Sequence, residues 1–170
     1  IEIGIPAGAP VRPSAGLISA GVLGEIRTVV ADHGQRFGFD AAHRLFAPVL
    51  GGGALLDLGI YPVSFASAVL GTPHRVTAVS DPASTGVDAQ TSILLQYPGG
   101  AHAVVTTTLE AQGSNRASII GTEARIEIEA IWYTPTSFSL VLPAGTFTDI
   151  DAGDEHALVS GKLDFECGAD

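Results

Sequence analysis

The most regular hydrophobic pattern in the chain follows three consecutive glycines, Gly51-Gly52-Gly53. Residues 54–70 (ALLDLGIYPVSFASAVL) carry apolar side chains at helical spacing, and Gly71-Thr72-Pro73 supplies a stop signal. This pattern predicts one helix over 54–70. Because Pro62 has no backbone N–H to donate, we expect a kink near Gly59. We interpret the glycine run as a flexible lead into the helix.

Downstream of Pro73 the pattern changes to short segments that favour β-strands. In residues 102–110, every second position is largely polar, and the positions between them are more apolar. The short connections at 98–100 and 121–123 require antiparallel hairpins rather than crossovers. The strands expected in this part of the chain are 75–80, 91–97, 102–109, 116–120, 125–130, 137–142 and 146–150.

The residues before the long helix complete the outline. Residues 1–20 form an irregular lead-in and a short helix, which Ser14 would cap and Gly21 would end. Residues 25–33 predict a strand that a loop follows, and residues 21–170 together make one domain. Because the strands have one polar face, we predict an α+β fold: an open, mainly antiparallel β-sheet with helices packed on one face.

Composition and charge exclude several classes of function. The chain has 170 residues, with 18 Asp+Glu against 8 Lys+Arg and a formal net charge of -10. So acidic a chain offers little to neutralise phosphates, and we expect no nucleic-acid partner. We also expect no membrane partner, because Asp57, Gly59 and Pro62 interrupt the best apolar stretch well short of the roughly 20 residues a membrane helix needs. The single cysteine, Cys167, excludes an internal disulfide and suits a cytoplasmic protein.

Asp57 and Tyr61 are the first candidates for chemistry. They lie four residues apart, so a helix would place them on one face, one turn apart. A carboxylate beside a phenol can act as an acid/base pair. The structural alternative is that Asp57 favours a helix N-terminus and Tyr61 packs in the core. Spacing alone leaves both interpretations open.

The evidence for other sites is weaker. His33 and His43 flank a polar loop without the spacing of metal ligands, and the acidic run at 149–156 departs from the calcium-loop pattern, so we expect no metal site. The sequence contains no glycine-rich phosphate loop and no nucleophile elbow. Nucleotide phosphates therefore have no recognisable cradle in these residues.

Three more side chains, Arg27, Trp132 and Tyr133, are candidates either for a site or for an ordinary structural role. Arg27, in a mostly apolar predicted strand, either binds a carboxylate or ligand, or reaches water at an edge. Trp132 and Tyr133 follow a predicted strand, where aromatic residues most often pack in the core.

Four stretches resemble one enzyme family. They are GEIRTVVADHGQ (24–35), GGGALLDLGIYPVSF (51–65), LLQYPGGAHAVVTTTL (94–109) and ASIIGTEARIEIEAIWYTPT (117–136). Together they resemble the C-terminal domain of Gfo/Idh/MocA oxidoreductases, closest to the branch of dihydrodiol dehydrogenase and NADP-linked xylose dehydrogenase. The resemblance runs from about residue 21 to 143, and GGGALLDLGIY is its most specific motif.

The resemblance implies an NAD(P)-dependent enzyme that transfers hydride between a nicotinamide cofactor and a sugar, polyol or dihydrodiol. In such enzymes an N-terminal Rossmann domain binds NADP or NAD and supplies a lysine. Asp57 and Tyr61 match the acidic and proton-transfer positions of the family's Asp-x-Gly-x-His/Tyr motif, which implies catalytic roles. Arg27 matches a substrate-contacting arginine, and either Trp132 or Tyr133 falls where the branch has a pocket aromatic.

The resemblance has limits at both ends. The Rossmann domain is absent from this sequence, and the match fades beyond Pro143, although residues 161–166 resemble the start of the family's penultimate helix. We therefore expect a piece of a longer enzyme, cut short at its C-terminal end and inactive alone. The alternative is a non-catalytic sheet domain that serves oligomerisation or small-molecule binding. In either case, the polar sheet face predicts a homodimer.

Overall fold

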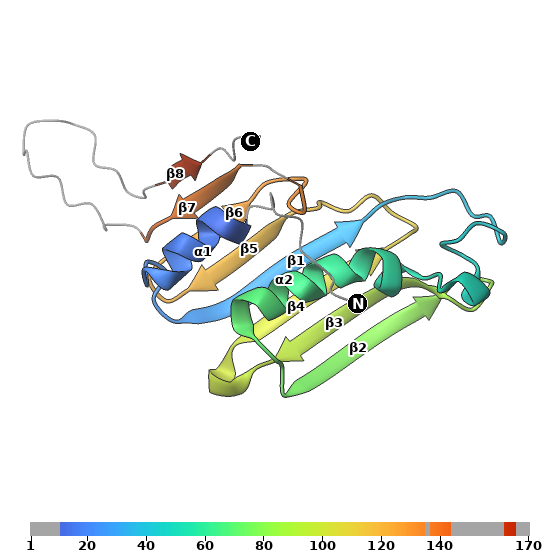
Figure 1. Ribbon diagram of the computed structural model, residues 1–170, viewed down its shortest axis with the longest axis horizontal. Coiled ribbons are helices and arrows are strands. Elements are labelled where there is room, and N and C mark those ends of the chain that lie inside the picture. Colours follow the sequence, from blue (N-terminus) through green and yellow to red (C-terminus); the bar gives the residue numbers. More distant parts are fainter. Residues whose placement is uncertain (1–10, 135–136, 144–161, 166–170) are drawn as a thin grey trace, which may run out of the picture.

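A computed structural model of the protein describes residues 11–134, 137–143 and 162–165. Within these residues, eight strands form one sheet in the order β2-β3-β4-β1-β5-β6-β7-β8 (Figure 1). The strands are β1 (Ile26–Gly34), β2 (Arg75–Pro82), β3 (Asp88–Gln96), β4 (His102–Thr108), β5 (Ala117–Gly121), β6 (Arg125–Ile128), β7 (Phe138–Val141) and β8 (Lys162–Phe165). The helical elements are α1 (Val11–Ser19), the 3-10 turns η1 (Pro48–Leu50) and η3 (Pro98–Gly100), the π-helical turn η2 (Leu55–Gly59) and α2 (Ile60–Leu70).

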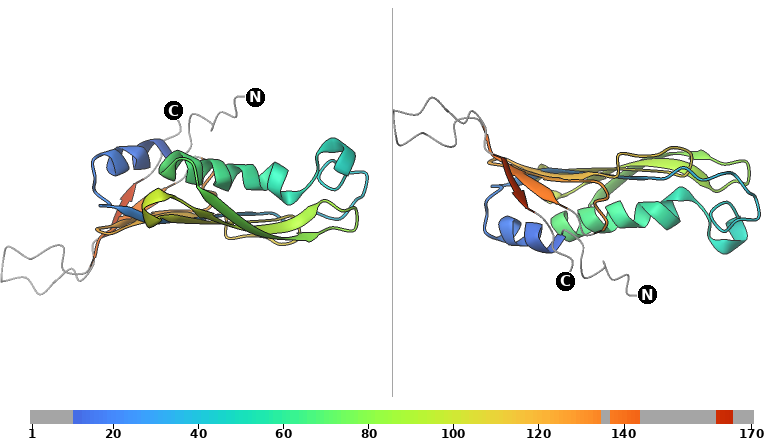
Figure 2. Two further views of the ribbon diagram at one scale, coloured as in Figure 1. Left: turned by 90° about the horizontal axis from the view of Figure 1, so that it is seen from below. Right: turned by 90° about the horizontal axis from the view of Figure 1, so that it is seen from above.

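Both α-helices lie on the same side of the sheet, and the other side is open (Figure 2). The alternation predicted for residues 102–110 is confirmed, because Ala103 and Val105 are buried beneath the helices while His102 and Thr106 are exposed. Phe65 and Ala66 of α2 complete this core. The predicted α+β class, with an open sheet and helices on one face, is therefore confirmed.

One pair of neighbouring strands in the sheet runs parallel, and every other described pair is antiparallel. The parallel strands are β1 and β4, whose last residues Gly34 and Thr108 lie opposite each other. Two neighbouring strands from distant parts of the chain therefore have their carboxyl ends at the same end of the sheet. The helical turn η2 contacts both strands at this end.

The strands β2 to β7 appear where the sequence predicts them, with ends shifted by a few residues. The predicted strand at 146–150, the acidic run at 149–156 and Cys167 lie outside the described residues. Residues 162–165 form strand β8, paired antiparallel with β7, so the expectation of a helix start there is wrong. The alternation of polar and apolar residues in Lys-Leu-Asp-Phe has the period of a strand.

The first helix begins earlier than its sequence suggested. Helix α1 starts at Val11, so Ser14 lies inside it and is not its N-cap. Pro13 does not prevent this start, because proline is tolerated in the first turn of a helix. Gly21 follows the helix with a positive φ of 74°, in agreement with its expected role as the stop.

The helix predicted over 54–70 consists of two parts, η2 and α2, which meet at Gly59 and Ile60. The interruption expected near Gly59 is this change from π-helical to α-helical geometry. Pro62 explains it, because Pro62 has no N–H to donate to the carbonyl of Leu58, four residues earlier.

The stretch Pro48–Leu70 has 23 residues and a mean hydropathy of 1.5, which is long and apolar enough to cross a membrane by length and composition. The expectation that no apolar stretch approaches the length of a membrane helix is therefore wrong. In the structure this stretch changes from 3-10 to π-helical to α-helical geometry, and Pro62, Phe65 and Ala66 are buried. Packing on the sheet accounts for part of its apolar side chains, and a single such stretch is weak evidence for a membrane span.

The glycine run before η2 is a tight junction, not the flexible lead that its sequence suggested. The Gly53 N–H donates to Leu45 O at 2.9 Å, and the Gly52 N–H donates to Ala47 O at 3.1 Å. Gly53 has a φ of +125°, and a Cβ there would lie 2.2 Å from Asp88 Oδ1. Asp88 in turn accepts the backbone N–H of Leu55 at 2.7 Å, which caps the start of the helix. Only glycine meets both the conformation and the space at residue 53.

We expect Gly53→Ala to lower the free energy of unfolding by about 2 kcal/mol, because an L-residue at this φ is strained. Its Cβ would also displace Asp88 from the helix start. Gly38→Ala is the matched control, since φ there is not positive and no atom lies within 4 Å of the added Cβ. Urea unfolding measures both variants. Equal midpoints for the two would contradict the assigned role of Gly53.

Candidate active site

Asp57 and Tyr61 lie at the junction of η2 and α2, where Asp57 is held by a loop residue, Arg44. Arg44 donates from Nη1 to Asp57 Oδ1 and from Nη2 to Asp57 Oδ2, the second at 3.4 Å. The hydrogen bond to Asp57 raises the pKa of Arg44, which therefore stays cationic. Arg44 could not be identified from the sequence, because nothing in a loop sequence shows which helix its side chain reaches.

The Tyr61 side chain is 41% exposed and is not sealed in apolar packing. One side of its ring contacts the side chains of His33 and Tyr133, with centroid distances of 5.3 Å and 5.7 Å. A charge on Tyr61 also contributes to the raised pKa of Arg44, so the phenol lies within electrostatic reach of the guanidinium. The structure therefore combines partial support of the ring with access to solvent.

His33 is a second residue that the sequence analysis did not place at this site. The strand β1 continues through His33, whose side chain is only 4% exposed. Its Nδ1 lies 3.2 Å from Leu58 O, and its ring stacks on Tyr133 at 4.0 Å. Burial lowers the pKa of His33, so the imidazole is mainly neutral near pH 7. The sequence did contain one indication that His33 is buried: it lies two residues beyond Ala31, on the same, buried face of the strand.

The two neighbouring aromatic residues after β6 have different surroundings. Trp132 is 3% exposed, donates from Nε1 to Asp32 O at 2.7 Å and packs against Phe65. Tyr133 is half-buried and contacts Tyr61. Burial raises the pKa of the Tyr133 phenol, and the charges of Tyr61 and Asp32 add to this shift. The structure thus brings Tyr133 to the predicted pair and places Trp132 in the core.

Arg27 lies at the other end of β1 from His33, roughly 20 Å away for six residues of extended chain. Its Nη2 lies 2.8 Å from Glu25 Oε2, and its Nη1 donates to Gly99 O at 3.4 Å. The side chain is about half exposed. The structure therefore does not bring Arg27 to Asp57 and Tyr61, and leaves it exposed with a carboxylate partner, Glu25, near the start of β1.

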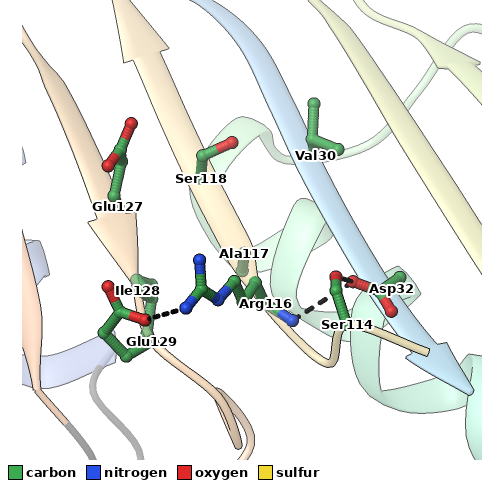
Figure 3. A pocket seen from close by; sticks show the side chains of 9 residues that line it. All are labelled: Val30, Asp32, Ser114, Arg116, Ala117, Ser118, Glu127, Ile128 and Glu129. Atoms are coloured by element: carbon green, nitrogen blue, oxygen red, sulfur yellow. Dashed lines mark hydrogen bonds and ion pairs between the residues drawn. The ribbon is translucent and has the colours of Figure 1, made fainter. Parts of the chain in front are cut away.

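A hollow of about 270 Å³ lies on the opposite, open face of the sheet (Figure 3). Arg116 and Glu129 form an ion pair across it at 2.7 Å, and Asp32 accepts from Ser114 Oγ and from the Arg116 N–H. Its charged groups are thus largely paired with one another, and it lies on the face away from Tyr61. Within the described part of the chain, no group of three or more His, Cys, Asp or Glu side chains could hold a metal ion.

Comparison with known proteins agrees with this arrangement. The sequence model of the GFO/IDH/MocA C-terminal domain matches residues 14–127. The trans-1,2-dihydrobenzene-1,2-diol dehydrogenase of Mus musculus is 36% identical over 146 residues, which cover 84% of this chain and 42% of that protein. The enzyme of Bos taurus with the same name is 38% identical over 122 residues, 71% of this chain and 36% of that protein. The chain therefore spans about two fifths of the length of these curated relatives.

Solved structures show the same fold. An aldose-aldose oxidoreductase from Caulobacter crescentus is 30% identical, with a TM-score of 0.65 over 74% of this chain and 39% of that one. A 3-ketoreductase from Actinomadura kijaniata, solved with NADP and TDP-benzene, has a TM-score of 0.72 at 22% identity over 93% of this chain and 46% of that one. Because the sequence model covers more than half of its residues, the chain belongs to the GFO/IDH/MocA family and contains the family's C-terminal domain.

Proposed function

We propose that this chain is the substrate-binding and catalytic C-terminal domain of an NAD(P)-dependent oxidoreductase, which transfers hydride between a nicotinamide cofactor and a sugar, polyol or dihydrodiol. The observation that carries the proposal is the accessible Tyr61 phenol, four residues from an ion-paired Asp57. The names of the relatives support the substrate class, since they are dihydrodiol dehydrogenases and an aldose-aldose oxidoreductase.

In this proposal Tyr61 moves the proton of the substrate hydroxyl. A phenol at a solvent-accessible position can reach a bound hydroxyl and exchange the proton with water afterwards. Tyr133 is less suited to this step, because it is half-buried and its ring stacks on His33. We therefore assign the proton transfer to Tyr61 alone.

Asp57 orients the substrate hydroxyl or the Tyr61 phenol. A carboxylate can accept about four hydrogen bonds, and Arg44 occupies two of these positions. The remaining positions are available to hydroxyl groups. The positive charge of Arg44 also offsets the negative charge of the Asp57 carboxylate. The ion pair therefore adds no net negative charge near the phenol.

When bound, the nicotinamide of NADP or NAD supplies or accepts the hydride. The described residues fit one side of such a group, because Leu56 is 66% exposed directly before Asp57, and Leu50 of η1, earlier in the chain, is also exposed. Exposed apolar side chains beside a polar site favour a surface that another domain covers. Since this sequence has no glycine-rich phosphate loop, we propose that a separate Rossmann domain holds the cofactor's phosphates.

In the full-length enzyme, we expect Tyr61→Phe to lower kcat at least about 100-fold with KM changed only a few-fold, because the proton donor and acceptor is lost while the ring remains. Steady-state oxidation of a dihydrodiol or sugar measures both constants. Tyr97→Phe is the matched control, since the Tyr97 hydroxyl is buried in the core and has no hydrogen-bond partner among the described residues. Near-normal turnover of Tyr61→Phe would contradict the proposed function.

We also propose a homodimer through the open face of the sheet. Val30, Val104 and Leu94 lie in register across three neighbouring strands, β1, β4 and β3. Each of these three side chains is about 40% exposed on the face that no helix covers. An apolar row at the centre of a polar sheet face is self-complementary, as a two-fold interface between identical subunits requires.

We expect Val104→Asp to convert the dimer to a monomer, because it would bury a charge at the centre of the proposed interface. Val76→Asp is the matched control, since Val76 is exposed on the edge strand β2 and pairs with Leu95 on the helix-covered side. The mass in solution, from light scattering, distinguishes the two states. A monomeric unsubstituted protein, or an unaffected Val104→Asp dimer, would contradict the proposed interface.

A further inference from the structure

His33 is the most unusual buried polar group of the site. It extends from the end of β1 into the space between α2 and the segment that follows β6, and the proposed proton transfer does not use it. Its imidazole contacts both Tyr61 and Tyr133, whose rings also contact each other at 5.7 Å. The three rings, which we call the aromatic cluster, come from three segments that are far apart in the sequence.

The Leu58 carbonyl fixes the orientation of the imidazole. A carbonyl oxygen only accepts hydrogen bonds, so the 3.2 Å contact requires the proton of His33 to be on Nδ1. Pro62 stands where the usual helical donor to Leu58 O would be and has no N–H. The same proline that interrupts the helix therefore explains why a side chain from β1 hydrogen-bonds to it.

The fixed imidazole in turn supports the Tyr61 ring. Tyr133 stacks on His33 with the two rings at 29° to each other, whereas Tyr61 meets His33 edge to face at 74°. Such contacts restrict the ring torsion of a tyrosine whose other side is exposed to solvent. Proton transfer depends steeply on the position of the phenol oxygen, and a displacement of 1 Å can cost about 100-fold in rate.

We propose that His33 is a positioning residue for Tyr61, and that its hydrogen bond to Leu58 and its stack on Tyr133 hold the imidazole as the surface on which the Tyr61 ring rests. This inference rests on the proposed role of Tyr61 in proton transfer. His33 itself exchanges no proton with the substrate. Burial keeps it mainly neutral, so it adds no charge beside the phenol near pH 7.

Two substitutions in the full-length enzyme separate the two contacts of His33. His33→Asn keeps an amide N–H near the position of Nδ1 but removes the ring, and we expect kcat to fall about 10-fold or more with KM within about twofold. His33→Phe keeps the ring and loses the N–H, and we expect a smaller fall in kcat. His102→Asn is the control, because His102 is exposed on the open face, away from the aromatic cluster.

A merely structural role for His33 would lower stability but leave the turnover of folded enzyme unchanged. The solvent isotope effect on kcat distinguishes the two roles, because a misplaced phenol makes proton transfer more strongly rate-limiting and raises the effect. In the Tyr61→Phe background, His33→Asn is expected to cause no further loss of kcat, since its effect acts through the tyrosine hydroxyl.

The outcomes also separate this inference from the proposed function. A fully active Tyr61→Phe variant would overturn both. A large loss in Tyr61→Phe, together with wild-type kcat in both folded His33 variants, would overturn the positioning role alone. An equal loss of kcat from His33→Asn in the wild-type and Tyr61→Phe backgrounds would also overturn the positioning role, because the effect would then not act through Tyr61. If His33→Asn does not fold, His33→Phe alone provides the same comparison of kcat, isotope effect and double variant.

Discussion

The docking of η2 on the sheet is the constraint on which the rest of the structure depends. Three contacts fix it: Asp88 accepts the N–H of Leu55, the Thr107 hydroxyl donates to Ala54 O at 3.2 Å, and Gly59 lies against the Thr107 methyl group. Because no side chain separates Gly59 from the sheet, the helix backbone approaches β4 closely. The position of the Asp57 carboxylate and of the Tyr61 ring follows from this approach.

The candidate active site is assembled from segments that meet only in the folded chain. The parallel pairing of β1 and β4 brings the end of β1, with His33, to the end of the sheet where η2 docks. The tight junction at the glycine run brings the backbone of Leu45 against Gly53, so the preceding residue, Arg44, can reach Asp57. Asp57 and His33 therefore each have a polar partner that another segment supplies.

Local rules predicted what depends on neighbouring residues. The period of the apolar positions predicted a helical stretch over 54–70 and the strands β1 to β7, and the four-residue spacing indicated Asp57 and Tyr61 as a pair. Contacts between distant segments were beyond those rules. The loop sequence around Arg44 did not indicate its carboxylate partner, and the choice between Trp132 and Tyr133 depends on where the chain leaves β6. The predicted strand over 25–33 already included His33, but its role depends on the parallel pairing of β1 with β4 and on the docking of η2 at this end of the sheet.

The strand β1 connects the two faces of the sheet. Because successive side chains alternate, Val30 lies on the open face, while Ala31 and His33 lie beneath the helices. Asp32 contacts both layers: its carboxylate accepts hydrogen bonds from Ser114 and Arg116 beside the open hollow, and its backbone carbonyl accepts the indole N–H of Trp132 in the core. Trp132 directly precedes Tyr133 of the aromatic cluster. A shift of β1 caused by contacts on the open face would therefore move groups that support Tyr61, and the two faces cannot vary independently.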